Sequence, residues 1–471
     1  MKLFLKRLLS IFLALIGILV LFHLIEDWRG ARAKDQWLKA SISAGMPQTL
    51  EEMAPPKIPD AENFATHPAV ADDLAGKPGK PGPVLPAVFS DGDLFRAWER
   101  GERIDLDALK TTLKINDFKA ILAPFDTQLV GFKEASLRPH CRLMTTYGNE
   151  IPGLIGMRQR GRVLSLRAVI ALRDGKSEEA MSDILTILRV VKHLKQEPHL
   201  ISQLLRIVYV RFSLQPIWEG LGTHQWNDQQ LSRLQDALVD IDLLGSWRQS
   251  WIAESIYQRE GMKQIAGGPI WSTSFLNDSI FGKGRIANLL SIVFIPKGWI
   301  YQNLINVGRL HQAQFIDGID PVHHHLDARE FDAIANSWSQ SPRTPYTWLA
   351  KLDIDATSQH TRRMGHSQSS LDQAFVACAL ERYFLAYRTY PERLDDLVPK
   401  YADKIPVDIL DGKSLCYRKE TKNSYLLYSI GWNGTDEGGN AAFDFQHQPH
   451  HLLEKGDWVW MSPRNKNTFA P

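Results

Sequence analysis

Apolar and polar residues follow three different patterns along this chain, and the first is an almost unbroken apolar run near the N-terminus. The run extends from Leu8 to Ile25. A helix of this length crosses about 30 Å of hydrocarbon, and it satisfies its own backbone hydrogen bonds, as a bilayer requires. The pattern therefore predicts a transmembrane anchor over residues 1–27.

Charged residues on either side of the apolar run indicate how the chain is oriented in the membrane. Basic residues precede the run, and Glu26 and Asp27 follow it directly. Basic segments stay on the cytoplasmic side, so this arrangement favours a single-pass membrane protein with its N-terminus inside and most of its chain outside the cytoplasm. The alternative is a signal peptide cleaved near Ala31–Ala33, which also leaves the chain extracytoplasmic.

Proline and glycine are frequent after the anchor, and we expect a linker over residues 28–90. Its clearest part is Ala75–Pro86, in which glycine loosens the chain and proline extends it. The anchor helix could continue through Trp37–Ala44, before a series of prolines prevents any long helix.

The second pattern is an apolar residue at every third or fourth position, and it dominates residues 91–351. The clearest example is Gly156–Pro198, where Asp174-Gly175 separates two helical stretches and Ser177 is placed to cap the second. The pair resembles one helical hairpin of a tetratricopeptide-type array, but no fixed period continues it. We therefore predict a helical domain that is an irregular bundle or a short solenoid.

Further helices are expected after this hairpin. His199–Leu221 forms one, and the stretch beginning at Trp226 forms another, with Asn227 or Asp228 as its cap. Leu289–Ile295 is very apolar but too short to cross a bilayer. We interpret it as a buried core helix, with a patch that lies on the membrane as the alternative.

The third pattern begins near residue 366, where a long amphipathic helix precedes short strands. Residues such as Ala377, Leu380 and Phe384 share one face of the helix, which Tyr390-Pro391 ends. A hairpin turn is expected between the first two strands. The predicted strands are Leu415–Arg418, Tyr425–Ile430 and Gly456–Met461.

A set of landmarks in this C-terminal segment matches a known family. They are Tyr390-Pro391, Leu394, Leu397, Val398-Pro399, Pro406, Asp408, Asp411-Gly412, Tyr417 and the stretch "YLLYSIGWNGTDEGG". Over about Ser369–Trp460 the chain resembles the C-terminal portion of the major pseudopilin of type II secretion. The resemblance implies an α+β domain over residues 366–471, with a long helix packed on a small antiparallel sheet. A pseudopilin joins its transmembrane helix directly to this domain, whereas a long helical segment separates the two here, so we expect a borrowed domain.

The same resemblance implies a metal site in the loop after the second strand, where the family binds calcium. The matching positions are Asn433, Asp436 and Asp444. Calcium takes six to eight oxygen ligands, and glycines let backbone carbonyls turn toward it. Asn433 stands where the family usually has an aspartate, which removes one charge. The alternative is a glycine-rich turn that needs only positive φ angles.

Composition excludes several classes of protein. The chain has 55 basic and 53 acidic residues, a near-balance that gives no basis for nucleic-acid binding. Its three cysteines are far apart, whereas zinc sites need closely spaced ligands. The sequence has no GxSxG, HExxH or phosphate-binding GxxxxGK[ST] motif. We interpret the histidines His323–His325 and the pair Asp353 and Asp355 as surface residues.

Together with the resemblance, these observations favour a single-pass protein of the bacterial inner membrane with most of its chain extracytoplasmic. We expect it to bind or scaffold protein partners in the cell envelope, beside type II secretion-like machinery, rather than to act as an enzyme. An envelope hydrolase with its site in the helical domain is the alternative, and calcium-dependent adhesion is a third. A carboxylate pair converging in the helical domain favours the hydrolase. A shallow concave helical surface favours binding.

Overall fold

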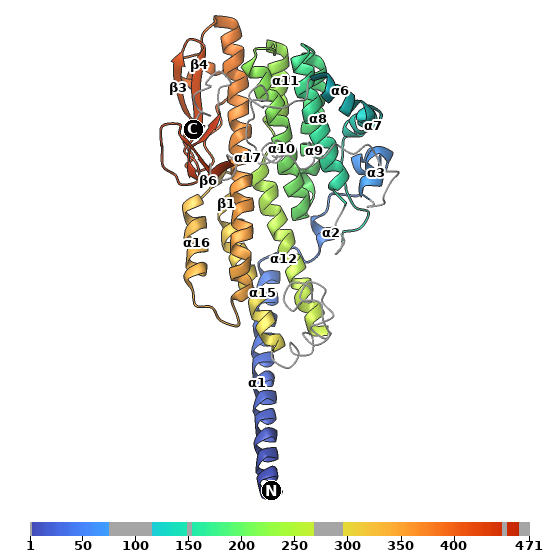
Figure 1. Ribbon diagram of the computed structural model, residues 1–471, viewed down its shortest axis with the longest axis vertical. Coiled ribbons are helices and arrows are strands. Elements are labelled where there is room, and N and C mark those ends of the chain that lie inside the picture. The colour runs from blue at the N-terminus through green and yellow to red at the C-terminus, as the bar shows by residue number, and fades with distance from the viewer. Residues whose placement is uncertain (1, 75–114, 148–152, 268–294, 445–449, 461–471) are drawn as a thin grey trace. The chain divides into compact units, whose positions relative to one another are not determined.

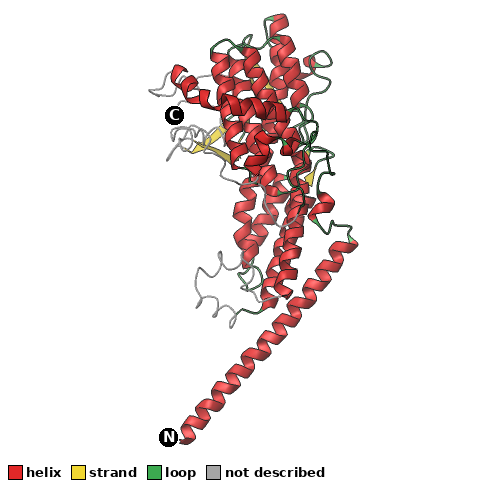
Figure 2. Ribbon diagram, turned by 90° about the vertical axis from the view of Figure 1, so that its right-hand side faces the viewer, coloured by secondary structure: helices red, strands yellow, loops and turns green. Residues whose placement is uncertain are grey.

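Helices dominate the structure, a computed structural model that describes residues 2–74, 115–147, 153–267, 295–444 and 450–460 (Figures 1 and 2). The structure is 66% helical, with an N-terminal apolar helix and a small C-terminal antiparallel sheet, as the sequence predicts. The helices are α1 (Lys2–Ser43), α2 (Leu50–Met53), α3 (Pro68–Leu74), α6 (Ile115–Leu122), α7 (Asp126–Ser136), α8 (Ile155–Arg173), α9 (Ser177–His193), α10 (Leu200–Gly222), α11 (Asp228–Leu238), α12 (Leu243–Gly267), α15 (Lys297–His311), α16 (Ala328–Gln340) and α17 (Trp348–Tyr387). The strands are β1 (Ile319–Asp320), β2 (His325–Leu326), β3 (Cys416–Thr421), β4 (Ser424–Ser429), β5 (Ala441–Asp444), β6 (His450–Gly456) and β7 (Trp458–Trp460).

The chain forms two compact units, each built from three separate stretches of sequence. The anchor unit comprises Met1–Glu52, Trp251–Asp317 and Asp332–Ser358. The bundle unit comprises Met53–Ser250, Gly318–Phe331 and Gln359–Pro471. The predicted boundaries at residues 90, 351 and 366 concern which segments fold independently, and they stay a prediction.

The anchor unit begins with α1, a helix of 42 residues. Its most apolar window has a mean hydropathy of 2.9, and no residue of that window is buried. Within the described ranges, α1 is the one helix that is long and apolar enough to cross a membrane. The helix continues past the predicted end of the anchor to Ser43, so the segment around Trp37 extends it as the sequence suggests.

Two glycines let α1 and α15 approach each other at backbone distance. A Cβ atom on Gly30 would lie 2.2 Å from the Cα atom of Gly298, and one on Gly298 would lie 1.9 Å from the carbonyl oxygen of Glu26. The Asp27 carboxylate accepts the backbone N–H of Gly298 at 2.9 Å, which places a negative charge at the start of α15. Any side chain at either glycine would separate the two helices.

The carboxylate of Glu26 is buried at this contact, immediately after the apolar run. Arg29 lies 2.6 Å from its Oε1 atom. The Trp299 indole N–H and the Tyr346 hydroxyl donate to Oε2 at 3.1 and 2.9 Å. Because a buried carboxylate needs partners for its charge, this network ties α15 and the segment before α17 to the end of the apolar run.

A small core completes the packing of the anchor unit. Met262 of α12 packs with Ile300, Tyr301 and Ile305 of α15, and Trp37 of α1 packs against them. The core therefore joins the part of α1 beyond the apolar run to two other helices. The apolar residues 289–294, predicted as a core helix, lie outside the described residues.

The bundle unit contains the predicted helical hairpin as α8 and α9. Gly175 adopts a φ of +74° between them, a conformation that glycine reaches without strain. Ser177 does not cap α9 as predicted, because Lys176 occupies the cap position without a side-chain bond. The Ser177 hydroxyl instead accepts a hydrogen bond from Gln230 at 3.1 Å.

Two further helices follow as predicted. α10 begins at Leu200, and α11 begins with a capping box in which Asn227 and Gln230 satisfy each other's backbone N–H groups. Asn227 is therefore the cap, of the two candidates in the sequence.

The predicted linker contains folded structure up to residue 74. Phe64 and Val70 are fully buried, and the Asn63 side chain donates to the carbonyl of Arg142 at 3.0 Å. Prolines in this segment prevent a long helix but allow short packed turns. The proline- and glycine-rich stretch 75–86 lies outside the described residues.

The C-terminal segment forms an antiparallel sheet of order β3-β4-β7, which confirms the three predicted strands. A second antiparallel pair, β5 and β6, was not predicted. The preceding helix α17 begins at Trp348, well before the predicted start near residue 366. The sequence between Trp348 and Gly365 contains no proline or glycine that would interrupt it.

Replacing Gly298 by alanine is expected to destabilise the anchor unit by about 1–3 kcal/mol, because its Cβ atom would overlap the backbone of α1. The measurement is the free energy of unfolding of the detergent-solubilised chain. Gly261 in α12 is a matched control, since nothing lies within 4 Å of its Cβ position. Gly261→Ala should stabilise the helix by about 0.5–1 kcal/mol. Equal stability of the two variants would contradict the contact.

Candidate functional site

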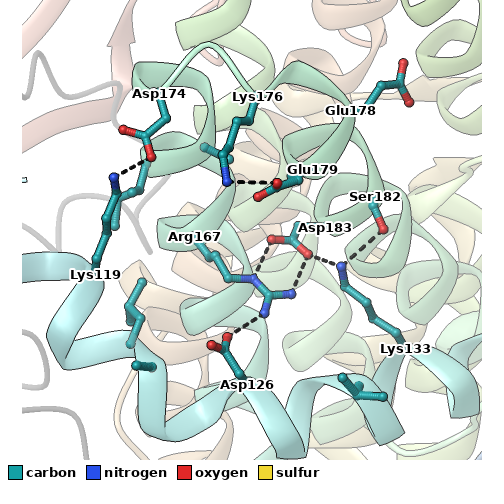
Figure 3. Close-up of a pocket in the computed structure, with 15 residues that line it drawn as sticks. Lys119, Asp126, Lys133, Arg167, Asp174, Lys176, Glu178, Glu179, Ser182 and Asp183 are labelled. Atoms are coloured by element: carbon teal, nitrogen blue, oxygen red, sulfur yellow. Dashed lines mark hydrogen bonds and ion pairs between the residues drawn. The ribbon is translucent and has the colours of Figure 1, made fainter. Parts of the chain in front are cut away.

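An open groove of about 600 Å³ lies in the bundle unit between α6 and α7 on one side and α8 and α9 on the other (Figure 3). Its apolar lining includes Leu122, Val130, Ile170 and Ala171. Val130 is 57% exposed, whereas Leu122, Ile170 and Ala171 are buried. The groove therefore offers apolar surface to a ligand from solvent.

Charged side chains of both signs surround this apolar surface, and two of the cations, Arg167 and Lys133, bind Asp183 (Figure 3). Arg167 binds both oxygens of Asp183, at 2.8 and 2.7 Å. Lys133 approaches the same carboxylate at 2.5 Å, and Asp126 accepts a third bond from Arg167 at 3.0 Å. Burial alone would lower the pKa of Arg167, but the bonds to Asp183 outweigh it and raise that pKa. The network joins α7, α8 and α9 at the base of the groove.

The remaining charges form ion pairs at the rim. Lys119 lies 2.5 Å from Asp174, and Lys176 lies 3.0 Å from Glu179, whose carboxylate raises the pKa of Lys176. These pairs are partly exposed, so each side chain can exchange its partner for a ligand group at small cost. Lys133 also donates to the Ser182 hydroxyl at 3.1 Å (Figure 3). With apolar surface between ion pairs, the groove can bind a ligand that carries both apolar and charged groups.

A second cluster lies in the anchor unit, around His311 of α15. Its Nε2 atom is 2.5 Å from Asp353, and its Nδ1 atom is 2.9 Å from the side-chain amide of Gln258. Both ring nitrogens of His311 are therefore hydrogen-bonded, one to a carboxylate and one to an amide. The cluster links α12, α15 and α17.

Glu254 of α12 belongs to the same cluster. Burial and the negative charge of Asp353 raise the pKa of Glu254 to about 7. Trp251 stacks on Phe315 with ring centroids 3.9 Å apart, and its ring meets His311 edge to face. These aromatic rings form an apolar wall beside His311.

The sequence analysis identified no partner for Asp353, and the structure provides His311, although the Asp353 side chain remains 30% exposed. The sequence interpretation considered a strand, on which Asp353 and Asp355 would share a face. The structure places both in a helix, where residues two apart point in different directions. Asp353 has His311 as its partner, and the Asp355 side chain lies outside the described part of the chain.

Glu197 in the bundle unit is a second buried acid, but it is well hydrogen-bonded. The Tyr147 hydroxyl donates to both of its oxygens at 2.8 and 2.7 Å, and the backbone N–H of Leu143 donates at 2.8 Å. Burial raises the pKa of Glu197 to about 7, although these donors lower it. This carboxylate fixes the segment before α8 and is structural.

The glycine-rich loop after β4 folds around Asp457, a residue that the sequence reasoning missed. The backbone N–H groups of Glu437, Gly439 and Asn440 donate to its carboxylate at 2.7–3.3 Å. Asp457 is completely buried, and burial raises its pKa. Positive φ angles at the loop glycines let these donors converge, which accounts for much of the glycine content.

The predicted calcium ligands lie in and beside the same loop. Asn433 and Asp436 each accept a hydrogen bond from the backbone N–H two residues further on, at 3.1 and 2.8 Å. The Tyr428 hydroxyl also donates to Asp436, at 3.0 Å. Asp444 is in β5, and its side chain lies outside the described residues. Calcium binding by these three residues stays a prediction.

The three adjacent histidines bind three different partners. His323 lies 2.5 Å from Asp320, and His324 lies 3.1 Å from Asp372. His325 binds a backbone carbonyl instead. Across the described ranges, no three His, Cys, Asp or Glu side chains are arranged to hold a metal ion.

No protein-family model, no curated protein and no solved structure matches this chain.

Asp183→Asn is expected to lower the free energy of unfolding by about 3 kcal/mol, because Arg167 and Lys133 would lose the charge that compensates them. The measurement is chemical unfolding followed by circular dichroism. Asp126→Asn is the control, since that side chain is 61% exposed and its loss should cost no more than about 0.5 kcal/mol. Similar losses in the two variants would show that Asp183 does not hold the helices together.

Glu254→Gln is expected to remove part of the pH dependence of stability. Folding raises the pKa of Glu254 from 4.5 to about 7, so the folded state binds the proton more tightly. The free energy of unfolding should fall as pH rises from 4.5 to 7, with the full penalty present above that range. Glu197 titrates in the same window. The melting temperature should therefore be measured from pH 4 to 8 for Glu197→Gln and for the double variant that also carries Glu254→Gln. The same change of melting temperature with pH in both variants would refute the prediction for Glu254.

Proposed function

We propose that this chain is a membrane-anchored extracytoplasmic protein of the bacterial cell envelope that binds or scaffolds protein partners. The observation that carries the proposal is the open groove in the bundle unit, with exposed apolar surface between paired charges. The N-terminal helix α1 supports the anchoring, because it is long and apolar enough to span a bilayer.

The lining of the groove indicates the kind of ligand it receives. Exposed Val130 offers a contact for one apolar side chain of a partner. Lys119 and Lys176 on the rim, with their acidic partners, offer exchangeable contacts to charges of either sign. A short segment of a partner protein, with an apolar side chain flanked by charged residues, has this chemistry. A uniformly charged polymer does not, because the groove carries both signs.

The C-terminal segment supports a partner in type II secretion-like machinery. The order of α17, β3, β4 and β7 agrees with a long helix followed by a small antiparallel sheet, the arrangement that the resemblance to the major pseudopilin implies. Asn433, Asp436 and Asp444 are the calcium ligands in this proposal. The resemblance is one of local sequence and element order, so the association with secretion is an inference by analogy.

A photo-crosslinking amino acid at Val130 tests the groove in intact cells. Val239 in the same unit is the matched control, because it is 59% exposed and lies outside the groove. We expect a discrete adduct with a secretion-machinery subunit from position 130 and none from position 239. In detergent pull-downs, Val130→Asp should lose that subunit, whereas Val239→Asp should retain it. Identical adducts from both positions, or none from position 130, would refute binding in the groove.

An envelope hydrolase is the second candidate, and the cluster of Glu254, Asp353 and His311 favours it. A carboxylic acid with a pKa near 7 beside an ionised carboxylate is a pairing used for acid–base hydrolysis. Turnover of a cell-wall polymer by the purified chain, abolished in Glu254→Gln while the fold is retained, would favour this function over binding.

A further inference from the structure

Three segments far apart in sequence meet where the apolar run of α1 ends. Glu26 follows the run directly, and its carboxylate binds Trp299 of α15 and Tyr346 of the α16–α17 connection. The charge of Glu26 marks the depth at which hydrocarbon must end, because an ionised carboxylate in lipid is costly. Residues hydrogen-bonded to it lie at the same depth.

Contacts on the apolar side of Glu26 support this depth. Trp299 meets Phe22, a residue within the apolar run, edge to face with ring centroids 5.8 Å apart. Trp28, two residues beyond Glu26, is 63% exposed. Tryptophan and tyrosine prefer the boundary between hydrocarbon and headgroups, where a polar atom and an apolar ring are both satisfied. The structure therefore gathers three such side chains, from three segments, at one level of α1.

The connection between α16 and α17 is held firmly at this level. The side-chain amides of Asn303 and Asn306 on α15 donate to the carbonyls of Pro345 and Tyr346 at 2.6 and 2.8 Å. Arg343, three residues before Tyr346, is exposed. The bonds to Pro345 and Tyr346 therefore fix the backbone close to Arg343.

The charges at this level favour an anionic surface. The acids are engaged within the protein, since Glu26 binds Arg29 and Asp27 binds the N–H of Gly298. Arg32, Lys297 and Arg343 are the basic residues around them, and Arg32 lies 5.7 Å from the ring of Trp28. A basic and aromatic surface continuous with a lipid-exposed helix matches the phosphate layer of a bilayer.

We propose that α1, the first turn of α15 and the α16–α17 connection form a collar that seats the anchor unit on the phosphate headgroups of the membrane. The proposal rests on the proposed anchoring of α1. The added claim is that folded segments lie at the bilayer surface, whereas a protein held only by a transmembrane helix and a flexible linker has no folded segment there. The collar includes Trp28, Trp299 and Tyr346 as its aromatic members and Arg32, Lys297 and Arg343 as its basic members.

Fluorescence quenching of the full chain in vesicles of phosphatidylethanolamine and phosphatidylglycerol tests the collar. A polarity-sensitive dye is attached at Arg343→Cys, with spin-labelled headgroups as the quencher. Arg309→Cys is the matched control, an exposed arginine on α15 about 18 Å along the helix from Lys297. Cys141 and Cys378 are buried, and the unsubstituted chain labelled in parallel corrects for Cys416.

We expect headgroup quenching to be several-fold stronger at position 343 than at position 309. A third label at Ile18→Cys, within the apolar run, reports the anchoring through quenchers placed on the acyl chains. Quenching at position 18 with equal, weak quenching at 343 and 309 would overturn the collar and leave the anchor intact. No quenching at position 18 would overturn both.

A second measurement avoids new cysteines. Brominated lipids quench tryptophans that lie in the bilayer, so Trp299→Phe should reduce the quenched fraction of the total tryptophan fluorescence. Trp338→Phe is the control, since Trp338 packs in the anchor unit against the cluster of Val307, Leu310, Ala350 and Ile354. Equal quenched fractions in the two variants would contradict the collar.

Discussion

The contact between Gly30 and Gly298 is the constraint on which the anchor unit depends. It brings two helix backbones within van der Waals distance, and only this approach places Trp299 and Tyr346 on the carboxylate of Glu26. Without this contact, the carboxylate of Glu26 at the end of the apolar run would be hydrated. In the structure it accepts hydrogen bonds from Trp299 and Tyr346 instead. The apolar helix α1 and the helices packed against it therefore share one set of interactions.

In the bundle unit, Asp183 is likewise a buried carboxylate that binds side chains from neighbouring helices. A buried carboxylate is costly by itself, and two cations from neighbouring helices compensate it. The compensation fixes how α7, α8 and α9 meet, and the groove lies above it. Apolar packing of the helices tolerates small shifts, whereas a bidentate pair between Arg167 and Asp183 does not. The polar network thus sets the geometry of the surface that we propose binds a partner.

The sequence predicted elements well where a local signal sufficed. The break at Asp174-Gly175, the cap at Asn227 and the three C-terminal strands depend on nearby residues, and the structure confirms them. No partner was identified for Asp353, because His311 is 42 residues away and nothing local marks it. Glu254 was missed because Asp353, whose charge acts on it, is likewise distant in sequence. The backbone donors to Asp457 are 17 to 20 residues away and have no signature in the sequence.

One local signal for the groove was nevertheless present in the sequence. Asp183 lies within the apolar stripe of its helix, next to Ile184, and an acid in such a place needs a cation from elsewhere. That pattern indicates a buried ion pair. It does not indicate which helix supplies the cation, because pairing of helices across long sequence separations depends on the whole fold.

The length of α1 has a consequence for how the membrane acts on the fold. Its 42 residues correspond to about 63 Å, roughly twice the hydrocarbon thickness, and the outer half packs into the anchor unit. In the anchoring that we propose, a change in bilayer thickness alters the tilt of the apolar half of α1. Because Gly30 and Trp37 hold the other half of the same continuous helix against α15, we expect that tilt to be passed on to the anchor unit.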